Sequence, residues 1–252
     1  MSIELKQLIS LVSNYLEVSS IPDHCPNGLQ VEGKFIIKRA ATAVSASFAT
    51  IQEAVNQKID ALIVHHGIFW RGDEFPIVGG KKKKIELLLQ NQISLLAYHL
   101  PLDAHREVGN NWKAASDFGW RNLVPFGEFN GMTIGVMGSF NKIPITVFTA
   151  EMEAYYEHIA YAAYGGKKEV KRAALVSGGA YKAIQEAARA GADCFVTGNF
   201  DEPVWGMAFE EEINFLALGH TATEKVGPKA LGKWIEKKGG ILCPFIDSNN
   251  PF

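Results

Sequence analysis

The segment Ile59–Trp70, IDALIVHHGIFW, sets the architecture that we predict for this chain. Ala61 to Val64 are apolar and partly β-branched, which is typical of a strand buried on both faces. His65 and His66 follow where such a strand should end, and Gly67 lets the chain turn sharply at little steric cost. Because ligands bind at the carboxyl ends of strands in open parallel sheets, the segment predicts two imidazoles at a ligand site.

Two interpretations of the histidine pair are open at this point. Adjacent residues of an extended backbone point to opposite sides, so His65 and His66 could serve two metal ions at once. Alternatively, one histidine is buried and bonded to the backbone while the other is solvated. The rest of the chain bears on this choice, because the unit that carries the pair is repeated.

A second copy of the same supersecondary unit lies 133 residues further along the chain (38 to 171). The copies share a KRAA sequence, an IQEA sequence and the aspartate that opens the next strand. These pieces are at 38–41 and 171–174, at 51–54 and 184–187, and at Asp60 and Asp193. The duplication predicts an α/β fold of two related lobes, 1–125 and 126–252, which share one metal site at the strand carboxyl ends and could pack as one domain.

The third strand of each copy ends in a histidine with a carboxylate four residues on. The pairs are His99 with Asp103 in ISLLAYHLPLD and His220 with Glu224 in INFLALGHTATE. Four of the seven histidines of the chain therefore fall at predicted strand ends, and a carboxylate beside imidazoles suits a divalent ion. Other roles stay open: His99 could be an outer-shell partner or a proton shuttle, and Glu224 could cap the last helix.

The composition describes an ordinary globular protein of one large or two medium domains. The 252 residues are 47% hydrophobic, and 25 Lys plus Arg against 27 Asp plus Glu give a net charge of -2. This balance argues against general nucleic-acid binding. No apolar run approaches the roughly 20 residues of a membrane span. The amino terminus has no signal-peptide pattern and the three cysteines are scattered, so we expect a cytoplasmic protein.

Hydrophobic periodicity predicts the remaining elements. The first helix is expected at 3–17, and a strand, a helix and a strand follow at 40–46, 48–57 and 59–65, with short β segments at 121–140. PITVFTAEMEAYYEHIAYAAY predicts one long helix over 144–164 that contains His158. After a helix that ends near Lys238, ILCPFID predicts a final strand.

Several other motifs allow both a functional and a structural interpretation. Lys81 to Lys84 could attract an anionic substrate or form the solvated start of a helix. Phe69 and Trp70 could stack on a planar base or close the hydrophobic rim of the site. His24 and Cys25 could be metal ligands, but they lie in a loop without a matching ligand spacing.

The second copy differs from the first at two turns. SGGA (177–180) could cradle a phosphate at a helix start, or it could be a tight turn between a strand and a helix. Gly198 and Asn199 are in the positions that correspond to His65 and His66. The histidine pair is therefore not duplicated, and this half would contribute a backbone wall or a polar contact instead.

Four motifs together resemble one known family. VHHG, HLPLDAH and GHTATE, with PNGLQVEG near the amino terminus, are similar to the dinuclear-metal hexameric family of GTP cyclohydrolase type 2 homologs, also called Nif-three-like proteins. The resemblance extends over nearly the whole chain. It implies a homohexamer with two divalent ions per chain, whether zinc, manganese, iron, cobalt or nickel. The implied ligands are His65, His66, Asp103, His220 and Glu224, with Glu224 bridging the ions.

The resemblance also implies a reaction, the hydrolytic opening of a purine ring with GTP as substrate. Two ions roughly 3.5 to 4 Å apart can activate a water molecule and polarise the electrophile that it attacks. In a GTP cyclohydrolase the electrophile is C8 of guanine, and His99, which matches a histidine near the family's site, would be the catalytic residue that moves protons. Asn199 departs from the pattern, because a close set of members has an acidic residue there.

Two other functions remain open. A dinuclear site serves phosphoesters and amides equally well, so the substrate could be another small molecule. A non-enzymatic hexamer that holds metal and acts through a partner would need the same ligands. An open coordination position in a polar pocket would distinguish the enzyme from the binding protein.

Overall fold

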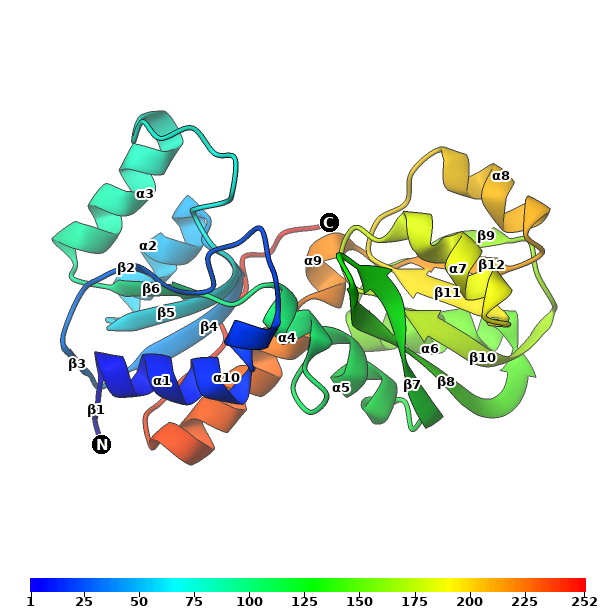
Figure 1. Cartoon of the computed structure of the whole chain (residues 1–252), viewed down its shortest axis with the longest axis horizontal. Coiled ribbons are helices and arrows are strands. Elements are labelled where there is room, and N and C mark those ends of the chain that lie inside the picture. The colour runs from blue at the N-terminus through cyan, green and yellow to red at the C-terminus, as the bar shows by residue number, and fades with distance from the viewer. The chain divides into compact units, whose positions relative to one another are not determined.

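The computed structural model describes all of residues 1–252, and these form two compact units. The first unit comprises Met1–Val108 and Gly227–Asn250, and the second comprises Gly109–Val226 and Pro251–Phe252. In each unit, helices cover both faces of one main sheet (Figure 1). The predicted α/β class is therefore confirmed. None of the helices is both long and apolar enough to cross a membrane.

The first unit is built on a four-stranded sheet of order β2-β6-β5-β4. β4, β5 and β6 are parallel, whereas β2 pairs with β6 in the antiparallel direction. A small second sheet pairs β1 with β3. The strands are β1 (Ile3–Glu4), β2 (Gly28–Val31), β3 (Ile36–Ile37), β4 (Ala40–Ser45), β5 (Ala61–His66) and β6 (Ser94–Ala97). The helices are α1 (Leu5–Tyr15), the 3-10 turn η1 (Val18–Ser20), α2 (Phe48–Asn56), α3 (Gly79–Gln90), α4 (Leu100–Ala104) and α10 (Val226–Gly239).

The sheet of the first unit is buried on both faces, as its continuous apolar strands predict. On one face, α1 and α10 contribute Leu8 and Ile235, which have no exposed surface. On the other face, α2 and α3 contribute Ile51 and Leu88, which are equally buried. Burying such a side chain stabilises the fold by roughly 1.5–3 kcal/mol. These two layers hold the parallel strands, and with them the strand ends that carry the histidines.

The second unit is built on a six-stranded sheet of order β7-β8-β10-β11-β12-β9. β10, β11 and β12 are parallel, and β9 pairs with β12 in the antiparallel direction. The strands are β7 (Arg121–Phe129), β8 (Met132–Pro144), β9 (Tyr161–Tyr164), β10 (Glu169–Leu175), β11 (Cys194–Thr197) and β12 (Asn214–Ala217). The helices are α5 (Asn110–Asp117), α6 (Ile145–Tyr156), the 3-10 turn η2 (Tyr181–Ala183), α7 (Ile184–Arg189), α8 (Pro203–Glu210) and α9 (His220–Thr223).

The core of the second unit has the same layered organisation. On one face, α5 and α6 contribute Ala115 and Phe148. On the other face, α7 and α8 contribute Ile184 and Val204, and both side chains are fully buried. Helix α10 follows this unit in sequence but packs with α1 of the first unit. The compact units therefore place 109–125 in the second unit and 227–250 in the first, unlike the halves expected from sequence.

The two main sheets repeat one arrangement, as the duplication predicts. The order β2-β6-β5-β4 corresponds strand by strand to β9-β12-β11-β10, with the same parallel and antiparallel directions. Gly28 pairs with Ala97 in the first sheet, and Tyr161 pairs with Ala217 in the second. The hairpin of β7 and β8 is an addition to the second sheet.

The long helix predicted over 144–164 is wrong in its second half. α6 ends at Tyr156, because Glu157 adopts a left-handed conformation with φ 53°. His158 follows this end and lies in the turn before β9, so it is not inside a helix. The YAAY sequence of β9 pairs with β12 along the edge of the sheet. Tertiary pairing here overrides a local sequence that is compatible with a helix.

The predicted final strand is also wrong. Two isolated bridges, from Leu242 to Arg39 and from Phe245 to Thr42, connect ILCPFID to β4, but no regular strand forms. Pro244 between them has no amide hydrogen to donate to a ladder. The strand β2, in contrast, was not expected in a stretch rich in turn-forming residues.

Candidate metal centre

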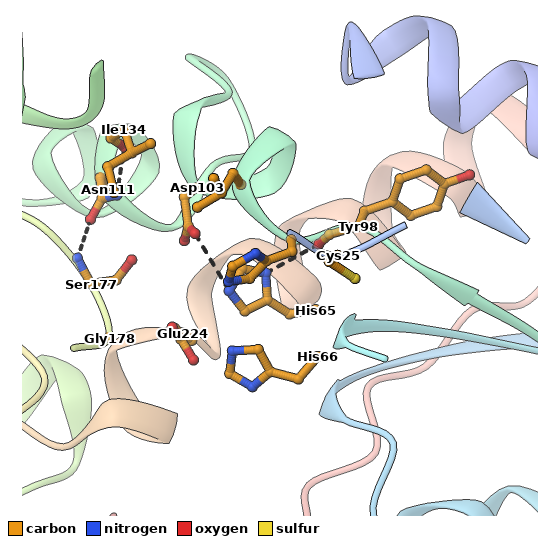
Figure 2. Close-up of polar contacts among 12 residues, drawn as sticks. Cys25, His65, His66, Tyr98, Asp103, Asn111, Ile134, Ser177, Gly178 and Glu224 are labelled. Carbon is orange, nitrogen blue, oxygen red and sulfur yellow. Dashed lines mark hydrogen bonds and ion pairs between the residues drawn. The ribbon is translucent and has the colours of Figure 1, made fainter. Parts of the chain in front are cut away.

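His65 is the last fully buried side chain of β5, with no exposed surface. Its Nδ1 lies 3.1 Å from the backbone oxygen of Tyr98, and its Nε2 lies 3.5 Å from Oδ2 of Asp103 (Figure 2). Because a carbonyl oxygen only accepts hydrogen bonds, Nδ1 of the neutral ring carries the proton and Nε2 carries the electron pair. Asp103 is in α4, directly after β6, and its side chain is 8% exposed.

His66 is the next residue of β5 and is half-buried. Its Nδ1 lies 3.0 Å from Oγ of Ser45, which is directly opposite on β4. The rings of His65 and His66 are 4.6 Å apart and inclined at 43°. The pair therefore remains close although the two residues alternate along a strand.

His99 follows β6 and caps the start of α4. Its Nδ1 lies 2.9 Å from Oδ1 of Asp23, whose side chain is only 2% exposed. Burial alone raises the pKa of the Asp23 carboxyl, but hydrogen bonds from His99, from Asn27 and from the Cys25 amide outweigh this effect. The pKa of Asp23 therefore lies well below its ordinary value, and the group is a carboxylate at neutral pH.

Asp23 was not predicted as a site residue. It lies in the polar turn before β2, where the sequence drew attention to its neighbours His24 and Cys25. The structure leaves the His24 side chain exposed and buries Cys25. Burial, followed by the charge of Asp23, raises the pKa of the Cys25 thiol to about 11. The only signal that could have indicated Asp23 is its position just ahead of the PNGLQVEG motif.

The first unit thus gathers three of the four strand-end histidines. One nitrogen from each of His65, His66 and His99 lies within 4.8 Å of the others. Trp70 borders this group, because its ring centroid is 5.0 Å from that of His99, edge to face, and 6.0 Å from that of His66. The expectation that Trp70 lies at the rim of the site agrees with this placement.

The loop that carries Trp70 has no counterpart of equal length in the second unit, where only five residues separate β11 from α8 (197 to 203). Gln30 holds the loop at its start by accepting the amide hydrogen of Ile68 at 2.8 Å. Lys81 holds it further along, with Nζ 3.3 Å from Asp73 and 4.8 Å from the ring centroid of Phe69. Phe69 therefore packs under a lysine.

The second unit places His220 and Glu224 together. His220 begins α9, and its Nε2 lies 3.2 Å from Oε1 of Glu224, whose side chain is 4% exposed. Nδ1 of His220 lies 3.2 Å from Oδ1 of Asn199. Asn199 thus contacts a predicted ligand from the position where the first copy has His66.

Glycines surround this pair where any side chain would collide. A Cβ on Gly178 would lie 2.3 Å from Oε1 of Glu224 and 3.2 Å from Nε2 of His220. A Cβ on Gly198 would lie 2.7 Å from Cα of His220. Gly178 has φ +66° and donates its amide hydrogen to Oγ1 of Thr223 at 3.0 Å. The close approach of Glu224 therefore accounts for the glycine at position 178 of the SGGA turn.

All four strand-end histidines have Nδ1 within hydrogen-bond distance of a protein oxygen. The partners are Tyr98 O for His65, Ser45 Oγ for His66, Asp23 Oδ1 for His99 and Asn199 Oδ1 for His220. Metal-binding histidines typically have one nitrogen held in this way, which orients the ring and leaves the other nitrogen for the metal. Imidazole nitrogens with buried carboxylates are also a donor set that divalent metals accept. In each unit, these residues therefore fit the role of metal ligands.

His105, His158 and the four lysines of α3 have contacts that explain them without a role in metal binding. His105 Nε2 bonds to the backbone oxygen of Tyr15 at 3.0 Å, and the two ring nitrogens of His158 each lie within hydrogen-bond distance of a backbone oxygen. Lys81 to Lys84 lie within α3, as the solvated-helix interpretation expects, and Lys82 and Lys83 are exposed.

Comparison with known proteins identifies the family. Residues 3–251 match the family Duf34/NIF3 (NGG1p interacting factor 3). This chain belongs to the Duf34/NIF3 family. The resemblance drawn from the four motifs is therefore confirmed. A family member from Chlamydia muridarum, named GTP cyclohydrolase 1 type 2 homolog, is 48% identical over 247 residues, which are 97% of this chain and 98% of that protein.

Two solved structures of the Duf34/NIF3 type are similar over their whole length. Protein ybgI, described as of unknown function, has a TM-score of 0.92 and 37% identity over 99% of this chain and 100% of its own. TTHA1606 from Thermus thermophilus has a TM-score of 0.88 and 34% identity over 99% of both chains. The fold of this chain is thus that of known structures in the family.

Proposed function

We propose that this Duf34/NIF3 protein is a metal-dependent hydrolase of the GTP cyclohydrolase type 2 kind, with two divalent ions per chain. One observation carries the proposal: each strand-end histidine has its Nδ1 held by a protein oxygen, the arrangement typical of metal-binding histidines. The name shared by close relatives, GTP cyclohydrolase 1 type 2 homolog, supports the choice of substrate.

The proposed ligands are those implied by the sequence motifs. They are His65, His66, Asp103, His220 and Glu224, which would hold the ions. When bound, divalent ions supply Lewis acidity that polarises the electrophile and makes a water molecule more acidic. Asp103 and Glu224 are both buried, and a bound cation would offset the cost of burying their carboxylates.

His99 has a different proposed role, the transfer of protons. Its Nδ1 is occupied by Asp23, and its side chain is 20% exposed, so Nε2 can exchange a proton with a substrate. Trp70 packs against the same ring and limits the access of bulk water. A planar purine fits a site with an indole at its rim.

A second candidate function is a metal-holding protein without enzymatic activity. The family description, NGG1p interacting factor 3, favours this candidate because it names a relative by its interaction with another protein. The same ligands would then stabilise a homohexamer or present a surface to a partner. A hydrolase of another small molecule, such as a phosphoester, would share the centre but not the substrate.

The test begins with elemental analysis of protein purified without an affinity tag, followed by turnover assays with the metals found. About two ions per chain and a ring-opened product from GTP would support the cyclohydrolase. Two ions per chain with turnover of a phosphoester would show that the substrate is a phosphoester and not GTP. Two ions with no turnover of either class would favour the metal-holding protein, and no bound metal after supplementation would overturn the proposal.

A further inference from the structure

Asp23 is a buried carboxylate whose two oxygens are fully engaged. Oδ1 accepts hydrogen bonds from the Cys25 amide at 3.0 Å and from Nδ1 of His99 at 2.9 Å. Oδ2 accepts from Nδ2 of Asn27 at 3.0 Å and from the Leu100 amide at 2.9 Å. Three of these four partners can only be donors, and the carboxylate can only accept. The fourth, His99, must therefore present a protonated Nδ1.

Two further contacts fix the ring of His99. Oδ1 of Asn27 accepts the backbone amide hydrogen of His99 at 2.8 Å, so the turn before β2 holds both the backbone and the side chain of this histidine. Trp70 packs against the ring at 83°, with the centroids 5.0 Å apart. The imidazole is thus restrained at Nδ1, at its own amide and across its ring plane.

We propose that Asp23 is a positioning residue that holds His99 in the Nδ1-protonated tautomer and directs the free electron pair of Nε2 toward His65 and His66. This inference rests on the proposed function only where it concerns turnover. The tautomer itself is a property of the first unit, since all the contacts that determine it lie within that unit.

The consequence for a hydrolytic step is specific. As the oxygen of water bonds to the electrophilic carbon of a C=N bond, one proton of the water passes to Nε2 of His99 and from there to that nitrogen, and Asp23 faces the imidazolium that forms in between. When the bond from the carbon to its second ring nitrogen breaks, the hydroxyl proton passes by the same route to the leaving nitrogen, and the carbon becomes a formyl group. The opposite tautomer, with Nε2 protonated and Nδ1 free, could not accept the first proton at Nε2.

The decisive measurement is nitrogen NMR of chelator-treated protein labelled with ¹⁵N-histidine, with the His99 signals assigned from His99→Gln. In the wild-type chain, we expect the unprotonated, pyridine-type nitrogen of neutral His99 to be Nε2. In Asp23→Asn, an amide nitrogen next to His99 would favour the opposite tautomer, so part of the pyridine-type signal should move to Nδ1. Asp60→Asn is the matched control, because it neutralises another buried carboxylate that bonds to backbone amides but contacts no histidine.

The spectrum of the wild-type chain tests the predicted tautomer of His99 even if Asp23→Asn fails to fold. An unprotonated Nδ1 in wild-type His99 would overturn the inference, and so would an unchanged tautomer in a folded Asp23→Asn chain.

Kinetics of metal-loaded protein give a separate readout. For Asp23→Asn, we expect kcat to fall about 10- to 100-fold, with KM and metal content within twofold of wild type, whereas Asp60→Asn should keep kcat. An unchanged kcat in Asp23→Asn would overturn the catalytic consequence. If the wild-type chain turns over no substrate, the proposed function fails. The NMR measurement of the tautomer still tests whether Asp23 positions His99.

Discussion

The ammonium group of Lys34 donates a hydrogen bond to the carboxylate of Asp60 at 2.7 Å, and the second unit contains the same pair at the same spacing in sequence. There, Lys167 donates to Asp193 at 3.0 Å. Each aspartate directly precedes a parallel strand, and less than one-tenth of its surface is exposed. The repeat thus preserves an ion pair at the start of the strand, whereas the histidine pair at the end of β5 is replaced by Gly198 and Asn199 in the second copy.

Asp60→Asn should destabilise the chain at neutral pH by about 1–3 kcal/mol, because the buried acceptor of two backbone amides and Lys34 is weakened. Burial alone raises the pKa of Asp60, but these hydrogen bonds outweigh it and the pKa lies below its ordinary value. A lowered pKa in the folded state stabilises the protein above about pH 4. That stabilisation is lost as the pH falls through the folded pKa, so the difference between the variant and wild type should shrink there.

Urea denaturation between pH 3 and pH 7 measures this effect. Lys34→Met is the control: the Lys34 side chain is 44% exposed, so the loss should be no more than about 1 kcal/mol. A difference between Asp60→Asn and wild type that stays constant down to pH 3 would contradict the assignment.

The sequence predicted the fold well wherever a strand is buried on both faces. The runs that became β4, β5 and β6 were recognisable because their residues are mostly apolar at consecutive positions, without polar alternation. The edge strands β2 and β9 were missed because their formation depends on a partner strand. The 133-residue offset relates these two strands to each other (28 to 161), but neither had a signal strong enough to indicate the other.

His66→Ala should lose bound metal while the secondary structure is retained. His66 is half-buried at a strand end, so truncation removes a proposed ligand without opening the core. Elemental analysis together with circular dichroism measures both properties. His24→Ala is the control: its side chain is exposed, and it should keep the full metal content. Equal metal content in the two variants would show that His66 is not a metal ligand.

Gly178→Ala should weaken metal binding at least tenfold without changing any ligand. The new Cβ would lie 2.3 Å from Oε1 of Glu224, so the carboxylate must move. Gly131→Ala is the matched control, because Gly131 also has a positive φ, +83°, but open space around it. Both variants should lose about 1–2 kcal/mol of stability from the left-handed backbone. If Gly131→Ala impaired metal binding equally, the effect would be one of stability.

The sequence indicated the proposed ligands but not the residues that orient them. Asp103, His220 and Glu224 were recognisable because a histidine and a carboxylate recur at equivalent strand ends, and His65 and His66 because they end a buried strand. The oxygens that bond to Nδ1 come from a turn, a backbone carbonyl and a neighbouring strand. Their proximity follows only from the folded chain, which is why Asp23, 76 residues from His99, could not be identified.

Asn199→Leu should weaken metal binding about 10- to 100-fold, because it removes the oxygen that orients His220 through Nδ1. Asn199→Asp should bind metal as tightly as wild type or more tightly. A carboxylate keeps the acceptor and, through its charge, increases the basicity of the imidazole. Competition with a chromophoric chelator measures both affinities. Because the side chain is exposed, neither variant should change the melting temperature appreciably. Equal affinity for Asn199→Leu and wild type would show that His220 needs no orienting partner.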